Sequence, residues 1–294
     1  MKRVVILGCG FVGARAARLF AQAGWEVTGV TRSAGSAALL AGEPFRALAC
    51  DIADPAALSA AVELKDADTV ISAVSSGRGG EDAYRQVYLR GLENVAEILR
   101  PRGILFVSST SVYAQNDGSW VTEQSPAEPV SATSRVLREA EEVALECGGQ
   151  VARLAGIYGP GRSVLLRRFL DGTAMIEGDG GRHLNQIHAE DAAGALFHMI
   201  TRDLPGGIYN VADDMPVTQR ACHEWMAAAL NRPMPPTGPV DLQRKRGVTN
   251  KRVSNAKLRS TGWEPRYPTF REALALDPAL LAAALAGGSG DAGP

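Results

Sequence analysis

The chain begins with an apolar segment that runs directly into a glycine-rich turn. Residues 4–7 read Val-Val-Ile-Leu, and residues 8–13 read Gly-Cys-Gly-Phe-Val-Gly, a G-x-G-x-x-G spacing. Between a buried strand and a helix, this spacing is typical of the first βαβ unit of a dinucleotide-binding fold. We expect Gly8 to permit the tight turn, Gly10 to admit the pyrophosphate and Gly13 to let helix and strand pack closely. Phe11 and Val12 complete the predicted cofactor loop, which leads into a helix N-terminus with free N–H groups.

Strand and helix signals alternate through the first half of the chain. The predicted strands are 4–7, 27–31, 45–50, 69–73, 104–108 and 150–154, and the predicted helices are 13–23, 56–64, 83–99 and 134–146. Short links between such elements favour a parallel sheet with helices on both faces. The sequence therefore predicts an α/β fold, a Rossmann-type doubly wound parallel sheet with a smaller C-terminal substrate lobe.

The composition changes after Arg153, where glycine and proline become more frequent and strand signals become short. We expect a dinucleotide-binding Rossmann domain over 1–158, to which segments at about 185–212 return. Residues 159–184 and 213–283 are predicted to form the smaller substrate lobe. The Ala/Gly/Ser-rich end, 284–294, is predicted to be a flexible tail.

Composition and charge exclude several function classes. The 294 residues carry a net charge near −1 with no basic stripe, which argues against a nucleic-acid or anionic-membrane partner. No run approaches the roughly 18 apolar residues that a membrane span needs, and the N-terminus lacks a signal-peptide pattern. The four cysteines are scattered without disulfide or zinc spacing, and neither they nor the four histidines indicate a metal site. These features predict a cytoplasmic protein.

The end of the second predicted strand bears on the choice between NAD and NADP. An NAD site usually has Asp or Glu there to hold the ribose 2′-hydroxyl, but this chain has Thr31, Arg32 and Ser33. We therefore expect Arg32 to meet a 2′-phosphate, with Thr31 and Ser33 as additional donors, so that NADP is preferred although NAD can bind. Further predicted contacts are Asp51 and Ile52 at the adenine, and Ala73, Val74 and Ser75, within 72–76, at the adenosine ribose.

Later segments resemble the extended short-chain dehydrogenase/reductase superfamily, of the NAD(P)-dependent epimerase/dehydratase type, over nearly the whole chain. The matching segments are 108–113 (SSTSVY), 153–162 (RLAGIYGPGR), 185–191 (NQIHAED) and 209–211 (YNV). The resemblance implies that Ser109 is the catalytic hydroxyl, which hydrogen-bonds the substrate beside the nicotinamide. It also implies that Tyr158 borders the nicotinamide. The oligomeric state stays open; members of that family often dimerise through a helix pair, and in this chain a possible homodimer would use helices 83–99 and 134–146.

One departure from that family affects the chemistry. No tyrosine in the chain has a lysine four residues later, although the family uses such a Tyr/Lys pair for proton transfer. Alignment on Glu139 puts Ser131 at the tyrosine position and Arg135 at the lysine position, which resembles an "atypical" subgroup. Arg135 could keep the contact with the nicotinamide ribose, but an arginine side chain is not deprotonated in proteins, which excludes the lysine's part in proton relay. Tyr113 is the first candidate for the substitute acid, ahead of Tyr158 or the substrate, and packing is its alternative role.

Two functions of different classes remain open from the sequence. The first is an NADP(H)-dependent oxidoreductase or epimerase/dehydratase-like protein acting on a small polar or sugar-like substrate. The second is a catalytically inactive nucleotide-binding sensor or partner-binding protein. The motifs beside the nicotinamide favour the first, and the missing Tyr/Lys pair favours the second.

Overall fold

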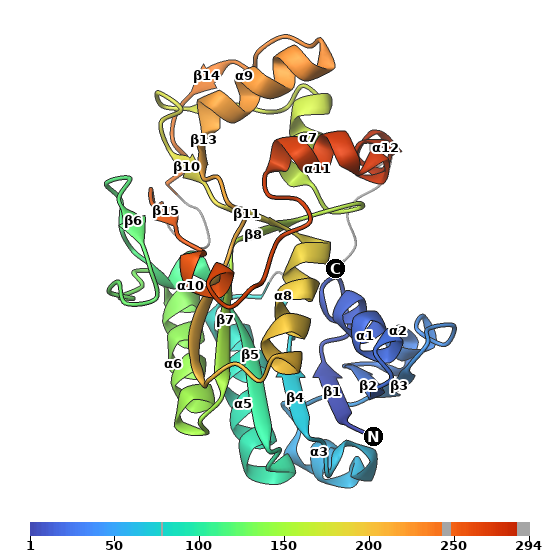
Figure 1. Ribbon diagram of the computed structural model, residues 1–294. Coiled ribbons are helices and arrows are strands. Elements are labelled where there is room, and N and C mark those ends of the chain that lie inside the picture. The colour runs from blue at the N-terminus through green and yellow to red at the C-terminus, as the bar shows by residue number, and fades with distance from the viewer. Residues whose placement is uncertain (78, 243–247, 287–294) are drawn as a thin grey trace.

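Seven parallel strands form the central sheet of the protein in a computed structural model that describes residues 1–77, 79–242 and 248–286 (Figure 1). The strand order is β12-β7-β5-β4-β1-β2-β3, and every neighbouring pair is parallel. The predicted doubly wound α/β fold is therefore confirmed, including the return of residues 207–211 to the sheet. The strands are β1 (Arg3–Leu7), β2 (Glu26–Thr31), β3 (Arg46–Ala49), β4 (Thr69–Ser72), β5 (Gly103–Ser109), β7 (Gln150–Leu154) and β12 (Gly207–Val211).

Helices cover both faces of this sheet because each central strand is apolar on both sides. Val4 and Ile6 of β1 pack into a core with residues of the first and eighth helices, whereas Val5 and Leu7 pack into a second core with residues of 58–64 and 95–99. Helix α1 packs closely against α8, and α6 packs against the helical segment 81–99. The helices of the sheet layers are α1 (Gly13–Gln22), α2 (Ala34–Ala38), α3 (Pro55–Ala60), α4 (Glu81–Tyr84), α5 (Gly91–Asn94), α6 (Ala132–Glu146) and α8 (Ala189–Thr201).

A third apolar core lies beyond the end of the sheet at which the strands finish, in the upper half of Figure 1. It joins residues of α7, α9, α11 and α12, which we call the small lobe; the predicted domain boundaries themselves stay a prediction. The small-lobe helices are α7 (Val164–Leu170), α9 (Gln219–Leu230), α11 (Phe270–Leu276) and α12 (Pro278–Ala286). Short strands and one short helix connect the lobe to the sheet: β6 (Trp120–Val121), β8 (Gly156–Tyr158), β9 (Ile176–Glu177), β10 (His183–Leu184), β11 (Gln186–His188), β13 (Val217–Thr218), β14 (Thr237–Gly238), β15 (Arg252–Val253) and α10 (Ala256–Arg259).

Some helices begin or end at residues other than those that the sequence predicted. The predicted helix 56–64 ends at Ala60 and continues as a 3₁₀ turn over Val62–Leu64. Helix α6 begins at Ala132, because the Ser131 hydroxyl accepts a hydrogen bond from the N–H of Ser134 and caps the helix. Residues 284–286 of the predicted tail are the end of α12, and residues 287–294 lie outside the described residues. Within the described ranges, no helix combines the length and apolarity that crossing a bilayer requires.

Candidate functional site

In the glycine-rich loop after β1, a side chain would meet different surroundings at each of the three glycines. Gly8 has φ +81°, and a Cβ there would lie 2.5 Å from the main chain of Ala73 and Val74. A Cβ on Gly13 would lie 2.3 Å from the carbonyl oxygen of Gly8, whereas one on Gly10 would meet nothing within 4 Å. The loop is thus tightly packed at both ends and open at Gly10, which is the cradle that a pyrophosphate needs.

The N-terminus of α1 adds donors to this cradle. The N–H groups of Gly8 and Cys9 both donate to the carbonyl oxygen of Val30, which ties the loop to β2. Within the described part of the chain, the N–H groups of Phe11, Val12 and Gly13 have no acceptor. Free N–H groups at the positive end of a helix favour an anion. The residues present therefore fit a dinucleotide.

The predicted adenosine contacts lie around the same edge of the sheet. Arg32 is exposed at the end of β2, and Ser33 caps α2 by accepting from the N–H of Ser36, while the Thr31 hydroxyl donates to the carbonyl oxygen of Ser33. Asp51 accepts from the N–H of Ala53, and Ile52 is buried against Gly91. The Ser75 hydroxyl accepts from the N–H of Gly77. The ends of β1, β2, β3 and β4 thus bring together Gly8, Arg32, Asp51, Ala73 and Val74.

Ser109 ends β5 beside the first turn of α6. Its hydroxyl accepts from the N–H of Ser111, and its residue is 9% exposed. The Ser131 hydroxyl donates to that of Ser134 at 2.9 Å, which donates to that of Ser111 at 3.0 Å. At the position where the similar family has its tyrosine, this protein therefore has a series of hydrogen-bonded serine hydroxyls next to Ser109.

Arg135 is not brought to this group of hydroxyls. It lies on the exposed face of α6, and its guanidinium donates to the carbonyl oxygen of Val130 at 2.7 Å. The buried face of the helix carries Thr133, Leu137 and Glu141 instead. The predicted ribose contact of Arg135 stays a prediction, and this orientation counts against it.

Tyr113 has a structural position. Its side chain is fully buried, its hydroxyl donates to Asn210 Oδ1 at 2.8 Å, and the Arg153 guanidinium lies over its ring. Burial raises the pKa of Tyr113, and the nearby Arg153 charge only partly offsets this. Proton transfer by Tyr113 stays a prediction, but a buried hydroxyl already engaged with an amide is poorly placed for it.

A buried ion pair supports the strand that carries Ser109. Glu141 of α6 accepts from Arg153 Nε at 2.9 Å and Nη2 at 2.6 Å, and from the Ser108 hydroxyl at 2.6 Å. Both charged side chains are essentially inaccessible, at 1% and 0%. A carboxylate in such a place requires this full set of donors. The pair therefore fixes β5 against β7 and α6 at the residue before Ser109.

Tyr158 and His188 mark the junction with the small lobe. Tyr158 belongs to the small-lobe core, where its ring contacts His188 and Phe270, and its hydroxyl is buried without a hydrogen-bond partner among the described residues. His188 is fully buried; its Nδ1 accepts from the N–H of Glu190, and its Nε2 lies 3.3 Å from Asp277 of the small lobe. The predicted contact of Tyr158 with the nicotinamide stays a prediction.

Sequence reasoning missed two neighbouring cations, the buried Lys251 and the partly buried Arg182. Lys251 is 5% exposed, and its ammonium donates to the carbonyl oxygen of Tyr113 at 2.9 Å and to the Thr249 hydroxyl at 2.8 Å. Burial, then the charge of Arg182, lowers the pKa of Lys251 to about 8. Arg182 Nε is buried, and its nearest carboxylate, Glu177, is 4.0 Å away. No carboxylate in the described ranges forms an ion pair with Lys251.

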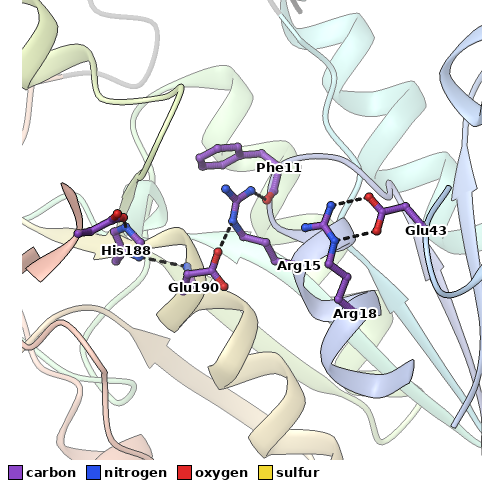
Figure 2. Close-up of polar contacts among 7 residues, drawn as sticks. Phe11, Arg15, Arg18, Glu43, His188 and Glu190 are labelled. Carbon is purple, nitrogen blue, oxygen red and sulfur yellow. Dashed lines mark hydrogen bonds and ion pairs between the residues drawn. The ribbon is translucent and has the colours of Figure 1, made fainter. Parts of the chain in front are cut away.

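A polar network beside the loop, drawn in Figure 2, was also missed. Arg15 Nη1 donates to the carbonyl oxygen of Phe11 at 2.6 Å, and Arg15 Nε donates to Glu190 Oε1 at 2.8 Å. One turn further along α1, Arg18 pairs with Glu43 through two hydrogen bonds. No sequence signal links Arg15 to Glu190, which are 175 residues apart. Over the residues that the structure describes, no group of three metal-ligating side chains comes together.

Comparisons with known proteins agree with this geometry. Residues 4–212 match the model of the NAD dependent epimerase/dehydratase family. Protein YeeZ of Escherichia coli (strain K12) is 31% identical over 284 residues, which cover 91% of this chain and 97% of that protein. A structure from Methylobacillus flagellatus, assigned as an NAD-dependent epimerase/dehydratase, is 27% identical with a TM-score of 0.77, covering 96% of this chain and 98% of its own.

A more distant structure is similar in fold alone. The dTDP-glucose 4,6-dehydratase DesIV from Streptomyces venezuelae, with NAD and TYD bound, has a TM-score of 0.78 at 21% identity. The alignment covers 96% of each chain.

Proposed function

Because this chain belongs to the NAD-dependent epimerase/dehydratase family, we propose that it is an NADP(H)-preferring oxidoreductase or epimerase/dehydratase-like enzyme. Its substrate is a small polar or sugar-like molecule. One observation carries this proposal: the open glycine cradle and Ser109 lie at the same edge of one parallel sheet. In open α/β sheets, ligands bind outside the carboxyl ends of the strands.

The cofactor would be held by main-chain groups at the loop and by side chains at the ends of β2 and β3. When bound, NADP(H) supplies hydride transfer at its nicotinamide. Arg32 supports the preference for NADP, because an exposed guanidinium stands where NAD sites carry a carboxylate. Asp51 and the main chain of Ala73 and Val74 border the adenosine.

The buried Lys251 and the partly buried Arg182 support a substrate with an anionic group. Lys251 and Arg182 repel each other, and among the described residues the carboxylate recorded beside them is that of Glu177, which lies 4.0 Å from Arg182, at the limit of ion-pair distance. Such a pair is costly unless an anion neutralises it. A phosphate or carboxylate of the substrate would neutralise the two cations. A sugar phosphate is both sugar-like and anionic, and it therefore meets both requirements.

Ser109 would orient the reacting oxygen of the substrate through a hydrogen bond. Its main-chain position is fixed by the neighbouring buried Ser108–Glu141–Arg153 contacts. A nucleotide sensor does not require a serine hydroxyl that buried contacts hold in place beside the cofactor site. The position of Ser109 therefore favours the enzyme over the sensor.

Two measurements test the proposal. Fluorescence titration should give a lower Kd for NADPH than for NADH, and Arg32→Ala should weaken NADPH by roughly ten- to a hundredfold, the range for one charge-assisted hydrogen bond, with little change for NADH. Arg102→Ala is the control, because Arg102 is exposed at the opposite edge of the sheet. NADPH oxidation should then be screened against phosphorylated sugars, sugar nucleotides and carbonyl compounds. Equal Kd values for the two nucleotides would refute the NADP preference. Tight nucleotide binding without turnover of any substrate would favour the catalytically inactive sensor over the enzyme.

A further inference from the structure

Arg15 is an unusual residue for its position on helix α1. It lies in the first turn, where the helix dipole disfavours a cation, and that turn carries no acidic residue. Its side chain is nevertheless only 18% exposed, and its guanidinium lies over the Phe11 ring at 4.3 Å. A cation held at the positive end of a helix needs partners elsewhere. In Figure 2 these are Glu190 of α8 and the carbonyl oxygen of Phe11.

The bond to Phe11 fixes the direction of one donor of the cradle. The peptide that joins Phe11 to Val12 is planar and trans, so its N–H points opposite to its C=O. Arg15 holds that C=O on the side of α8, and the N–H of Val12, which has no acceptor in the described part of the chain, therefore faces away from Arg15. A cation on the carbonyl oxygen also polarises the peptide and strengthens its N–H as a donor.

We propose that Arg15 and Glu190 form a positioning pair for the dinucleotide loop. Glu190 orients the guanidinium, and Arg15 orients the Phe11–Val12 peptide, so that the Val12 N–H is presented to the pyrophosphate before the cofactor arrives. Arg15 acts through the main chain and does not itself contact the nucleotide. This inference rests on the proposed dinucleotide site and adds to it a contribution from α8, the helix that packs against α1.

The chain contains its own matched control. Arg18 lies on the same helix one turn later and forms a comparable ion pair with Glu43, with hydrogen bonds of 2.7 and 2.5 Å. Its guanidinium makes no hydrogen bond to the main chain of residues 8–13 among the described contacts. Loss of Arg18 therefore reports on ion pairing along α1 without disturbing the Phe11–Val12 peptide.

The test is a fluorescence titration of the full chain with NADPH and, separately, with NADH. Arg15→Ala should raise the Kd of both nucleotides by the same factor, roughly tenfold or more, since one charge-assisted hydrogen bond to the loop is lost. Arg15→Lys should be intermediate, because one ammonium cannot hold both partners in the geometry of a guanidinium. Glu190→Gln should also weaken both nucleotides, and Arg18→Ala should leave both Kd values within about twofold of the parent.

Several outcomes would overturn the inference. Unchanged Kd values in Arg15→Ala, or an equal loss in Arg18→Ala, would make the pair a simple packing contact between helices. A loss confined to NADPH would mean that Arg15 contacts the 2′-phosphate. Tighter binding in Glu190→Gln would mean that Arg15 contacts the pyrophosphate directly and that Glu190 competes for it. If Arg15→Ala does not fold, Arg15→Lys and Glu190→Gln decide the question. Absence of binding in the parent protein would refute the proposed dinucleotide site as well, whereas parent-like binding by the variants refutes this inference alone.

Discussion

At the scale of single residues, the glycines of one short loop are required for different physical reasons. Gly8 adopts a left-handed conformation, and a Cβ there would clash with the main chain of Ala73 and Val74, just after β4; a Cβ on Gly13 would clash with the carbonyl oxygen of Gly8. A Cβ on Gly10 would meet nothing within 4 Å, and Gly10 is exposed. The first two are therefore needed for folding, while the third is needed only for what enters the open space.

Substitutions at the loop should separate these roles. Gly10→Val should fold with a Tm close to the parent and lose binding of both NADPH and NADH, because its side chain fills the cradle. Gly13→Ala should lower the free energy of unfolding by several kcal/mol, because its Cβ has no room beside the Gly8 carbonyl. Thermal melts and nucleotide titration of both variants check this, and a Gly10→Val protein that still binds would place the nucleotide elsewhere.

Lys251 illustrates a residue whose burial makes stability depend on pH. The pKa of Lys251 is about 8 in the folded protein, against an ordinary 10.5. The folded state therefore favours the neutral amine. This contribution to the free energy of unfolding is fully present above pH 10.5 and is lost as the pH falls through about 8. The folded chain then carries a buried cation at neutral pH, a penalty of roughly 3 kcal/mol.

Comparison with Lys251→Met tests this sign. The free energy of unfolding of the parent, relative to the variant, should decrease between pH 10 and pH 7. Added inorganic phosphate should raise the Tm of the parent and not that of the variant. Parallel pH curves would show that Lys251 is not the titrating group, and equal phosphate effects would argue against its role in anion binding.

At the scale of elements, α6 shows how one helix serves the site from its buried face. Ser131 caps its N-terminus, and Glu141, nearly three turns further along, binds Arg153 and Ser108 beneath Ser109. The alignment with the family's Tyr/Lys pair falls on Ser131 and Arg135, which occupy the cap and the exposed face. The helix therefore contributes support for β5 and a cap, and the sequence match alone does not bring Arg135 to the site.

Two serines near this helix should respond differently to alanine in turnover. Ser131→Ala should lower the free energy of unfolding by about 1 kcal/mol through loss of the cap, with turnover nearly unchanged. Ser109→Ala should also lower the free energy of unfolding, by about 1 kcal/mol, because its hydroxyl accepts from the N–H of Ser111, but it should in addition reduce kcat by roughly 10²–10³, the range for losing a positioned donor. Denaturant unfolding and steady-state kinetics measure both quantities, and an inactive Ser131→Ala beside an active Ser109→Ala would reverse the assignment.

At the scale of the whole molecule, the small lobe is joined to the sheet through His188. Its ring accepts from the N–H of Glu190, approaches Asp277 and packs between Tyr158 and Tyr267. Burial lowers the pKa of His188, although the Asp277 and Glu190 carboxylates oppose that effect and Arg15 adds to it. The neutral ring is thus the form that the folded junction holds. The predicted homodimer through 83–99 and 134–146 stays a prediction.

Acidification should weaken this junction. A depressed pKa means that the contribution of His188 is present above its ordinary pKa of 6.5 and is lost as pH falls through its lower folded value. The free energy of unfolding of the parent should therefore fall more steeply from pH 7 to pH 5 than that of His188→Gln, measured by urea unfolding. Asp277→Asn should move the loss to lower pH, because the carboxylate that favours the charged ring is gone. Curves of equal slope would exclude His188 as the cause.

The sequence by itself determined the parallel sheet and the glycine cradle. Both follow from local sequence patterns: apolar runs separated by helical segments, and glycines at positions 8, 10 and 13. Only the tertiary structure decided which side chains meet around that cradle. Lys251 reaches the carbonyl oxygen of a residue 138 positions away, and Arg15 reaches Glu190 on a helix from the far half of the chain. Such pairs depend on how helices and loops pack over the sheet edge, and packing is a property of the folded chain that no local pattern contains.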